Sequence, residues 1–442
     1  MAPAISWGPR RISPRGEFFV NGAGTFLQNF QFAVAALSRA WLLFFYGRSN
    51  FQGNNMTPTR LPGTFVCFSH LRWSFVYQRP QHLLSRAAQG YRVIFVEEPI
   101  YQAEGEPRLQ ISSDESGVTV VTPHLPHGQD CGELLDELFA PLANERVILW
   151  YYTPLALAYA PPFKAELIVY DCMDELSAFK FAPPELKDAE AALLKAAHVV
   201  FTGGQSLYEA KRGKHPNVHA FPSSVDARHF AKARQRGLPE PREYADIPHP
   251  RLGFFGVIDE RFDIELLEQM ADLRPDWSFV MIGPVVKIDP QALPKRANIH
   301  WLGGRDYKDL PEHLAHWDVG IMPFALNEST RYISPTKTPE FLAAGLPVVS
   351  AAITDVVRPY GELGRVEIAR SPEEFVRRCE GLLTRPPKEW LADVDDYLSG
   401  LSWDRTWNGM LGVMREAMPR RRSKVRSTAR AVASKGAGHV GV

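Results

Sequence analysis

The sequence predicts an α/β protein built from two Rossmann-like, doubly wound domains that face each other across a cleft. Short apolar runs rich in β-branched residues alternate with helical patterns along most of the chain, which is typical of parallel sheets covered by helices. A polar, proline-rich segment at residues 234–250 interrupts this alternation, and the alternation then restarts. With 442 residues, the chain is long enough for two such domains and a linker between them.

The N-terminal domain is expected over residues 56–233. Its strand patterns lie at residues 64–68, 91–98, 117–122, 146–152, 166–173 and 198–202. Its helical patterns lie at residues 76–89, 132–143 and 184–197. We expect a helix at residues 402–418 to complete this domain, and we expect the basic tail at residues 419–442 to be disordered.

The C-terminal domain is expected over residues 251–401, after the linker at residues 234–250. Its strand patterns lie at residues 251–259, 277–283, 298–304, 319–324 and 346–352. Its helical patterns lie at residues 263–273, 310–317 and 335–344. The two domains therefore repeat one architecture, in which ligands bind beyond the carboxyl ends of the strands.

Residues 1–55 are expected to be an extension that adds nothing to the fold. Their apolar stretch at residues 26–46 is interrupted by polar side chains, among them Gln28, Asn29 and Arg39. A membrane helix needs about 20 predominantly apolar residues, so we do not expect a membrane span here. A helix anchored on the membrane surface is the alternative.

Composition narrows the classes of function. The formal net charge is +0, so no global charge favours nucleic acid as a partner. Four cysteines occur without CxxC spacing or a histidine cluster: Cys67, Cys131, Cys172 and Cys379. They fit buried thiols in a reducing cytoplasm and argue against a metal site. We expect no metal and no cofactor.

The stretch from residue 333 to residue 351 is a helix between two strands, with an acidic residue at the helix start. Ser334 can cap this helix with Pro335 in its first position, or the helix can open later with Pro339 first. Gly345 can end it in the left-handed conformation. Glu340 then lies on the ligand-binding rim of the second sheet, outside the core.

Polar residues also follow two strands of the N-terminal domain. His70 and Arg72 come directly after the first strand, and Asp171 and Asp174 lie at the end of another. A carboxylate at this rim could accept the proton of an attacking hydroxyl, so Asp171, Asp174 and His70 are the candidate catalytic residues. Capping of a helix by Asp174 is the competing interpretation. The Asp-x-Asp pattern at residues 393–395 lies far from either rim, and we attribute it to chance.

Several segments together resemble bacterial glycosyltransferases of the two-Rossmann-domain (GT-B) type, family 4, and most of all the teichuronic acid biosynthesis group. The resemblance covers roughly residues 60–415. Its segments are SHLRWSFVYQRPQHLLSR, YDCMDELSAF, FFGVIDERFDIELL, IGPV with NIHWLGGRDYKDLPEHL, and MPFALNESTRYISPTKTPEFLAAGLPVVS.

The resemblance implies transfer of a sugar from a nucleotide diphosphate donor, held by the C-terminal domain, to an acceptor held by the N-terminal domain. Transfer in this family retains the anomeric configuration and generally needs no metal. Glu340 would bind the ribose hydroxyls, and Arg261 lies close to where relatives place a basic phosphate ligand. N–H groups at a helix start attract a diphosphate, so Ser334, Thr336 and Lys337 join the candidate substrate-binding residues.

One position departs from the family pattern. Many relatives carry two glutamates around this helix, and the earlier position is Tyr332 here. Any role of the missing acid would pass to Glu328 or to backbone groups. The departure leaves the donor sugar open.

The acceptor class and the location also follow from the resemblance. Lipid-linked acceptors are common in the family, and a basic tail adds about 1 kcal/mol per charge at an anionic membrane surface. We therefore expect a glycan or lipid-linked acceptor and a cytoplasmic protein, with peripheral contact to the inner face of the cell membrane as an option. Arg72 would contribute on the acceptor side. A sugar-nucleotide epimerase and a noncatalytic nucleotide-sugar-binding partner remain the alternatives.

Overall fold

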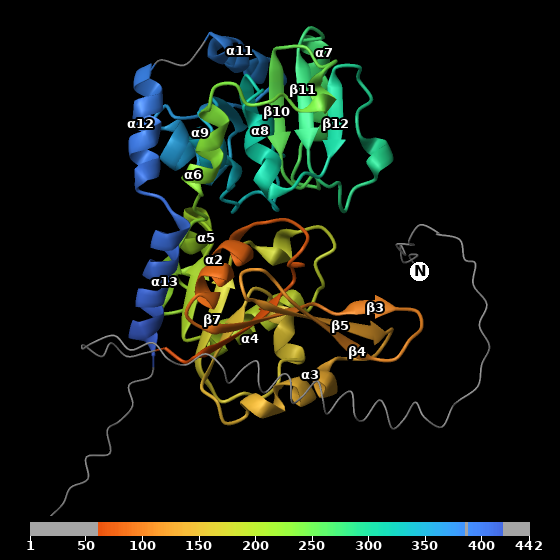
Figure 1. Ribbon diagram of the computed structural model, residues 1–442, viewed down its shortest axis with the longest axis vertical. Coiled ribbons are helices and arrows are strands. Elements are labelled where there is room, and N and C mark those ends of the chain that lie inside the picture. Colours follow the sequence, from red (N-terminus) through yellow and green to blue (C-terminus); the bar gives the residue numbers. More distant parts are fainter. Residues whose placement is uncertain (1–60, 385–387, 419–442) are drawn as a thin grey trace, which may run out of the picture. The chain divides into compact units, whose positions relative to one another are not determined.

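The computed structural model describes residues 61–384 and 388–418, all of which fall in one compact unit (Figure 1). The expectations for residues 1–55 and for the tail at residues 419–442 lie outside the described residues. Two parallel sheets with helices on their faces confirm the predicted α/β class. Within the described residues, no helix is long and apolar enough to cross a membrane.

The first sheet has nine strands in the described part of the chain, in the order β3-β5-β2-β1-β6-β7-β8-β9, with β4 paired antiparallel to β5. The other pairings are parallel. The strands are β1 (Thr64–Ser69), β2 (Arg92–Glu97), β3 (Ile100–Gln102), β4 (Arg108–Ser113), β5 (Thr119–Pro126), β6 (Val147–Tyr151), β7 (Ala165–Cys172), β8 (Val199–Thr202) and β9 (Val218–Ala220).

The second sheet has six parallel strands in the described residues, in the order β12-β11-β10-β13-β14-β15. The strands are β10 (Arg251–Phe255), β11 (Ser278–Ile282), β12 (Ile299–Gly303), β13 (Val319–Met322), β14 (Val348–Ala351) and β15 (Glu367–Ala369). In each sheet the strand order reverses beside the first strand of that sheet, β1 or β10. Ligands bind at such reversal points in open α/β sheets, so we expect a ligand site at the loops after β1 and β10.

The helices in the described residues are α2 (Arg79–Ala88), α3 (Gly132–Phe139), α4 (Leu186–Ala196), α5 (Gln205–Lys211), α6 (Ala227–Phe230), α7 (Ile264–Leu273), α8 (Leu310–Leu314), α9 (Lys337–Ala343), α10 (Thr354–Val356), α11 (Pro372–Leu383), α12 (Lys388–Ser399) and α13 (Trp403–Ala417). The three-residue strands β3, β9 and β15 and the mostly polar strand β4 were not predicted, because none of them contains a long apolar run.

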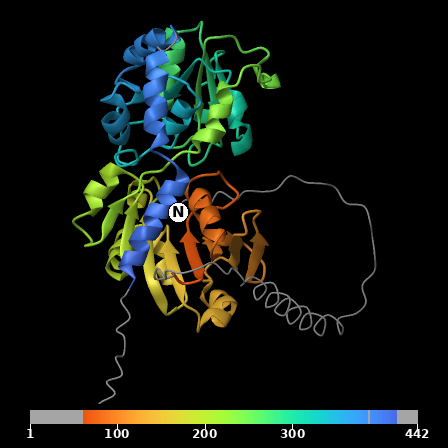
Figure 2. The ribbon, with the colours of Figure 1, turned by 60° about the vertical axis from the view of Figure 1, so that its left-hand side comes forward.

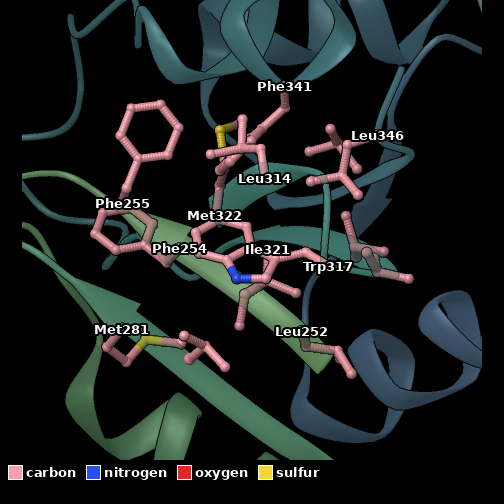
Figure 3. Close-up of a cluster of buried hydrophobic side chains, with 14 of the residues drawn as sticks. Leu252, Phe254, Phe255, Met281, Leu314, Trp317, Ile321, Met322, Phe341 and Leu346 are labelled. Atoms are coloured by element: carbon pink, nitrogen blue, oxygen red, sulfur yellow. The ribbon is translucent and has the colours of Figure 1, made fainter. Parts of the chain in front are cut away.

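Both faces of the first sheet carry a hydrophobic core. Alternate residues of β1 divide between the two faces, with Phe65 in one core and Val66 in the other, as the period of a strand requires. The second sheet has its own core, where Phe341 of α9 lies against Trp317 with ring centroids 6.2 Å apart (Figure 3). The expected linker at residues 234–250 contributes Tyr244 and Ile247 to this core, so part of it is folded onto the second sheet.

Helix α13 returns the chain to the first sheet. It lies against α2 and β8, beside the first sheet in both views (Figure 1 and Figure 2). Its apolar face belongs to the core that contains Phe65 and Trp150, and the Trp407 ring lies 6.0 Å and 6.3 Å from those two rings. The end of the chain therefore supplies part of the hydrophobic core of its first half.

The helix that carries Glu340 is shorter than the sequence predicted. It begins at Lys337 with Thr336 as N-cap, and no side chain caps it, so the predicted cap by Ser334 is wrong. Pro339 falls in the first turn, where its missing N–H breaks no internal hydrogen bond. The predicted end at Gly345 is confirmed by its positive φ of 75°.

Replacing Trp407 by alanine should destabilise the protein by about 3–5 kcal/mol, because the change leaves a large cavity in the core of the first sheet. Arg415→Ala is the matched control, since Arg415 is exposed on the same helix, and a surface change of this kind costs about 0.5 kcal/mol or less. Urea unfolding followed by circular dichroism measures both. Equal stability of the two variants would show that α13 adds little to this core.

Candidate functional site

Two glycine turns shape the carboxyl edge of the second sheet. Gly256 follows β10 and Gly283 follows β11, with φ of 150° and 148°. A Cβ atom on Gly283 would stand 1.7 Å from the carbonyl oxygen of Gly256, and one on Gly256 would stand 3.3 Å from Cε of Lys337. Only glycine allows these turns to approach each other so closely.

The glycine turns border a pocket of about 620 Å³, which is lined by residues from loops of both sheets. The contributing segments and single residues are 73–78, 254–257, 282–284, 305–308 and 333–337, with Met173, Asp174, Ser223, Arg261, Leu310, Phe324 and Glu340. The loops after β1 and β10 are both present, as expected from the reversal points of the sheets. The volume suits a nucleotide-sized ligand.

Glu340 and Lys337 form an ion pair on the wall of this pocket. The Lys337 ammonium lies 3.1 Å from Oε2 of Glu340, 3.0 Å from Oγ1 of Thr336 and 4.7 Å from the centroid of the Phe255 ring. Glu340 is only 5% exposed, and burial raises the pKa of its carboxyl although Lys337 opposes the shift. A buried carboxylate and a cation therefore meet at the same point of the wall.

Arg261 lies on the pocket and is held by Asp259. Its Nε and Nη2 atoms lie 2.9 Å and 2.7 Å from the two carboxylate oxygens of Asp259, and its guanidinium stacks on the Phe179 ring at 5.3 Å. This pairing fixes the orientation of the guanidinium before a ligand binds. Arg261 remains 24% exposed, which leaves part of it available to the pocket.

Asp174 lines the pocket just beyond the end of β7. Burial raises the pKa of its carboxyl to about 6, with the nearby Arg261 opposing and the Asp259 carboxylate adding to the shift. The competing interpretation as a helix cap is wrong, because the short helical turn that follows has Glu175 as its N-cap. Asp174 is thus a carboxyl group of raised basicity that faces the cavity.

Asp171 is not among the described residues that line the pocket. It is fully buried, and Arg79 at the start of α2 contacts it at 2.8 Å and 3.0 Å through Nη2 and Nε. The same guanidinium donates to the carbonyl oxygen of Phe221 at 2.7 Å. Asp171 therefore serves as the counter-ion of a buried arginine, in contrast to the expected catalytic role.

Three other candidates also lie off the pocket wall. Arg72 contacts the Glu97 carboxylate at 3.2 Å and the carbonyl oxygen of Glu98. His70 has a buried Nδ1 atom without a partner, and burial together with Lys287 lowers its pKa to about 4, so its ring is neutral near pH 7. Glu328 is 77% exposed and lies 3.7 Å from Arg331. The structure does not bring these three to the pocket.

Ser334 and Thr336 do line the pocket, together with aromatic residues that the sequence analysis missed. Tyr307 stacks on His229 with ring centroids 4.4 Å apart and lies 4.9 Å from Tyr77 of the loop after β1. The hydroxyl of Tyr307 is buried without a partner. The sequence does carry a signal for the glycine turns of this pocket, because Gly256 and Gly283 directly follow the apolar runs at residues 251–255 and 278–282.

Tyr332, at the position of the missing glutamate, packs against the core of the first sheet. The guanidinium of Arg331 lies over its ring at 5.2 Å. Tyr332 is not among the described residues that line the pocket. Within the described residues, no group of three or more acidic, histidine or cysteine side chains is placed to hold a metal ion.

Comparisons with known proteins show which family and which folds this chain is similar to. Residues 249–385 match the family described as glycosyl transferases group 1. Over 273 residues the chain is 28% identical to TuaH of Bacillus subtilis (strain 168), which is named as a teichuronic acid biosynthesis glycosyltransferase. The alignment covers 57% of this chain and 67% of TuaH.

Two solved structures share the fold. The E. coli trehalose-6-phosphate structure bound with UDP-2-fluoro glucose has a TM-score of 0.59 at 13% identity and covers 81% of this chain and 100% of that one. The structure of Anabaena HepE in complex with UDP has a TM-score of 0.56 at 11% identity and covers 80% and 99%. The predicted GT-B fold and the resemblance to glycosyltransferases are thereby confirmed.

Asp171→Ala should destabilise the protein by about 3–5 kcal/mol, because it leaves the buried Arg79 charge unpaired. Glu166→Gln is the control, since the Arg146–Glu166 pair lies on the surface and such pairs contribute about 0–1 kcal/mol. Urea titration of both variants measures the difference. Full stability of Asp171→Ala would mean that the ion pair is dispensable and would return Asp171 to the catalytic candidates.

Proposed function

We propose that this glycosyltransferase, with the GT-B fold and a group 1 domain at residues 249–385, transfers a sugar from a nucleotide diphosphate sugar to a glycan or lipid-linked acceptor in cell-surface polysaccharide synthesis. Transfer retains the anomeric configuration and needs no metal. The observation that carries the proposal is the Lys337–Glu340 pair beside the glycine turns, on one wall of a pocket that both sheets line.

The donor would occupy the second-sheet side of the pocket. Ribose hydroxyls donate to the Glu340 carboxylate, which is buried and pairs with the Lys337 ammonium. The diphosphate lies beside the turns at Gly256 and Gly283, which approach each other closely because both residues lack a Cβ atom, and which line this part of the pocket. Lys337 and Arg261 face the same space and supply positive charge. Charge-assisted hydrogen bonds of this kind are about twice as strong as neutral ones.

The reaction breaks the bond between the anomeric carbon and the diphosphate and forms one to the acceptor oxygen on the same face of that carbon, as retention requires. Negative charge grows on the leaving diphosphate in the transition state, so cations fixed in advance lower the barrier. Asp259 orients Arg261, and Glu340 orients Lys337, which removes much of the reorganisation that the reaction would otherwise require.

The acceptor would enter from the first-sheet side, where Asp174 lines the pocket. We assign Asp174 to accept the proton of the attacking hydroxyl. Its raised pKa of about 6 makes it a stronger base than an ordinary carboxylate, and it is still ionised near pH 7. His70 and Asp171 have no part in this proposal, because neither lines the pocket.

Transfer itself is tested by incubating the protein with UDP-, GDP- and ADP-hexoses and octyl glycosides, in EDTA and with Mg²⁺ or Mn²⁺. We expect nucleoside diphosphate and a glycosylated octyl glycoside to appear together, at similar rates in EDTA and with metal, because Lys337 and Arg261 neutralise the leaving group. Loss of product in EDTA with recovery on adding metal would contradict metal independence. An isomerised donor without released nucleoside diphosphate would identify an epimerase, and binding without turnover would identify a noncatalytic partner.

Replacing Glu340 by alanine should weaken binding of nucleoside diphosphate by about 10-fold to 150-fold, since charged hydrogen bonds contribute about 1.5–3 kcal/mol. Glu340→Gln keeps one acceptor oxygen and should lose less. Glu328→Ala is the control, because Glu328 is 77% exposed and lies off the pocket wall. Calorimetric titration with UDP, GDP and ADP, run alongside thermal melts, gives affinity and stability separately. Unchanged affinity in Glu340→Ala would remove the ribose role.

A further inference from the structure

The buried carboxylate of Asp355 accepts a hydrogen bond from the start of helix α5. Asp355 lies between strands β14 and β15 of the second sheet, and α5 lies between strands β8 and β9 of the first. The backbone N–H of Ser206, in the first turn of α5, donates to Oδ1 and Oδ2 of Asp355 at 3.0 Å and 3.3 Å. The two residues lie 149 positions apart in the sequence, and they are only 6% and 4% exposed. Asp355 lies in α10, which follows β14.

Two glycines at the start of α5 are enclosed from both sides. A Cβ atom on Gly203 would stand 2.3 Å from the carbonyl oxygen of Met173, next to Asp174. A Cβ atom on Gly204 would stand 2.4 Å from Oδ2 of Asp355 and 2.8 Å from Cβ of Ser334. The φ of Gly204 is −160°, which any residue adopts, so this position requires glycine for space.

Asp355 lines a second cavity that shares part of its wall with the donor pocket. Ser334 lines that pocket, and it also lines the second cavity, of about 490 Å³, together with Asp355. Ser223 and Pro335 are likewise shared by the two cavities. A shift of Asp355 therefore acts on the wall that the donor pocket shares with the second cavity.

We propose that Asp355 is a positioning residue for sugar transfer, an inference that rests on the proposed function. Through its bond to the Ser206 N–H, it holds the Gly203–Gly204 turn between Met173 on one side and Ser334 on the other. This contact sets the distance between Asp174, which takes the acceptor proton, and Lys337 and Glu340, which hold the donor. Asp355 itself touches no substrate.

A second polar contact between α5 and the segment after β14 is weaker than the Asp355–Ser206 contact. Nη1 of Arg358 lies 2.6 Å from Oε1 of Glu209, but the two side chains are 44% and 39% exposed. Exposed ion pairs contribute little because water screens them. This second contact provides a matched control for the buried contact.

The inference is tested on the full chain with Asp355→Ala, Asp355→Asn and the control Arg358→Gln. In Asp355→Ala we expect kcat to fall about tenfold or more, with the dissociation constant for UDP within about threefold of wild type, because the donor contacts lie apart from Asp355. Asp355→Asn keeps an acceptor oxygen and should recover part of kcat. Arg358→Gln should match wild type.

Amide hydrogen exchange gives a readout that does not need activity. In Asp355→Ala the Ser206 amide should exchange about tenfold faster or more, while the amides of β8 stay protected. Unchanged exchange at Ser206 would overturn the capping contact. Faster exchange with wild-type kcat would overturn the positioning role. A wild-type protein without transferase activity would instead remove the proposed function, and the positioning role with it.

Discussion

Burial of charge at the carboxyl ends of the strands is the constraint on which the site depends. An unpaired buried charge costs several kcal/mol, so each buried cation here is held by a carboxylate before any ligand arrives. The pair of Arg79 with Asp171 is sealed, with side-chain exposures of 1% and 0%. Lys337 and Arg261 have similar partners but keep 22% and 24% exposure on the pocket wall. This difference in exposure separates a sealed structural ion pair from cations that remain open to a ligand in the pocket.

The sequence predicted the architecture well because periodicity and glycine placement are local signals. The sequence predicted Glu340 on the ligand-binding rim from its place at the start of a helix between two strands, and Glu340 lines the pocket. Asp171 and Asp174 looked equivalent, since both lie at the end of one strand. Their environments differ because Arg79, which lies 92 residues from Asp171 in the sequence, pairs with Asp171, whereas Asp174 lines the pocket. Such long-range pairing leaves no local pattern to read.

The missing acid at Tyr332 has a structural explanation. In place of a carboxylate at this position, the chain carries a ring that packs on the core of the first sheet, and the Asn327 N–H donates to Oγ1 of Thr330 in the preceding turn. The loop between β13 and α9 is therefore held by an internal hydrogen bond and by the packing of Tyr332 on the first sheet. Under the proposed function, selectivity for the donor sugar comes from other groups on the pocket wall, and the aromatic residues around Tyr307 are placed to contribute.

The return of α13 to the first sheet has a consequence for biosynthesis. Trp403, Trp407 and Met410 belong to the same core as Phe65, so one face of the first sheet stays incomplete until residues near the end of the described chain leave the ribosome. Domains of large proteins commonly fold in order from the N-terminus as they are made, at about 5–20 residues per second. Here the early half must wait roughly ten seconds or more for its last helix, with apolar surface uncovered in the meantime. We therefore expect that folding of the first sheet during synthesis depends on chaperones that shield nascent chains, more than it would if each half of the chain folded by itself.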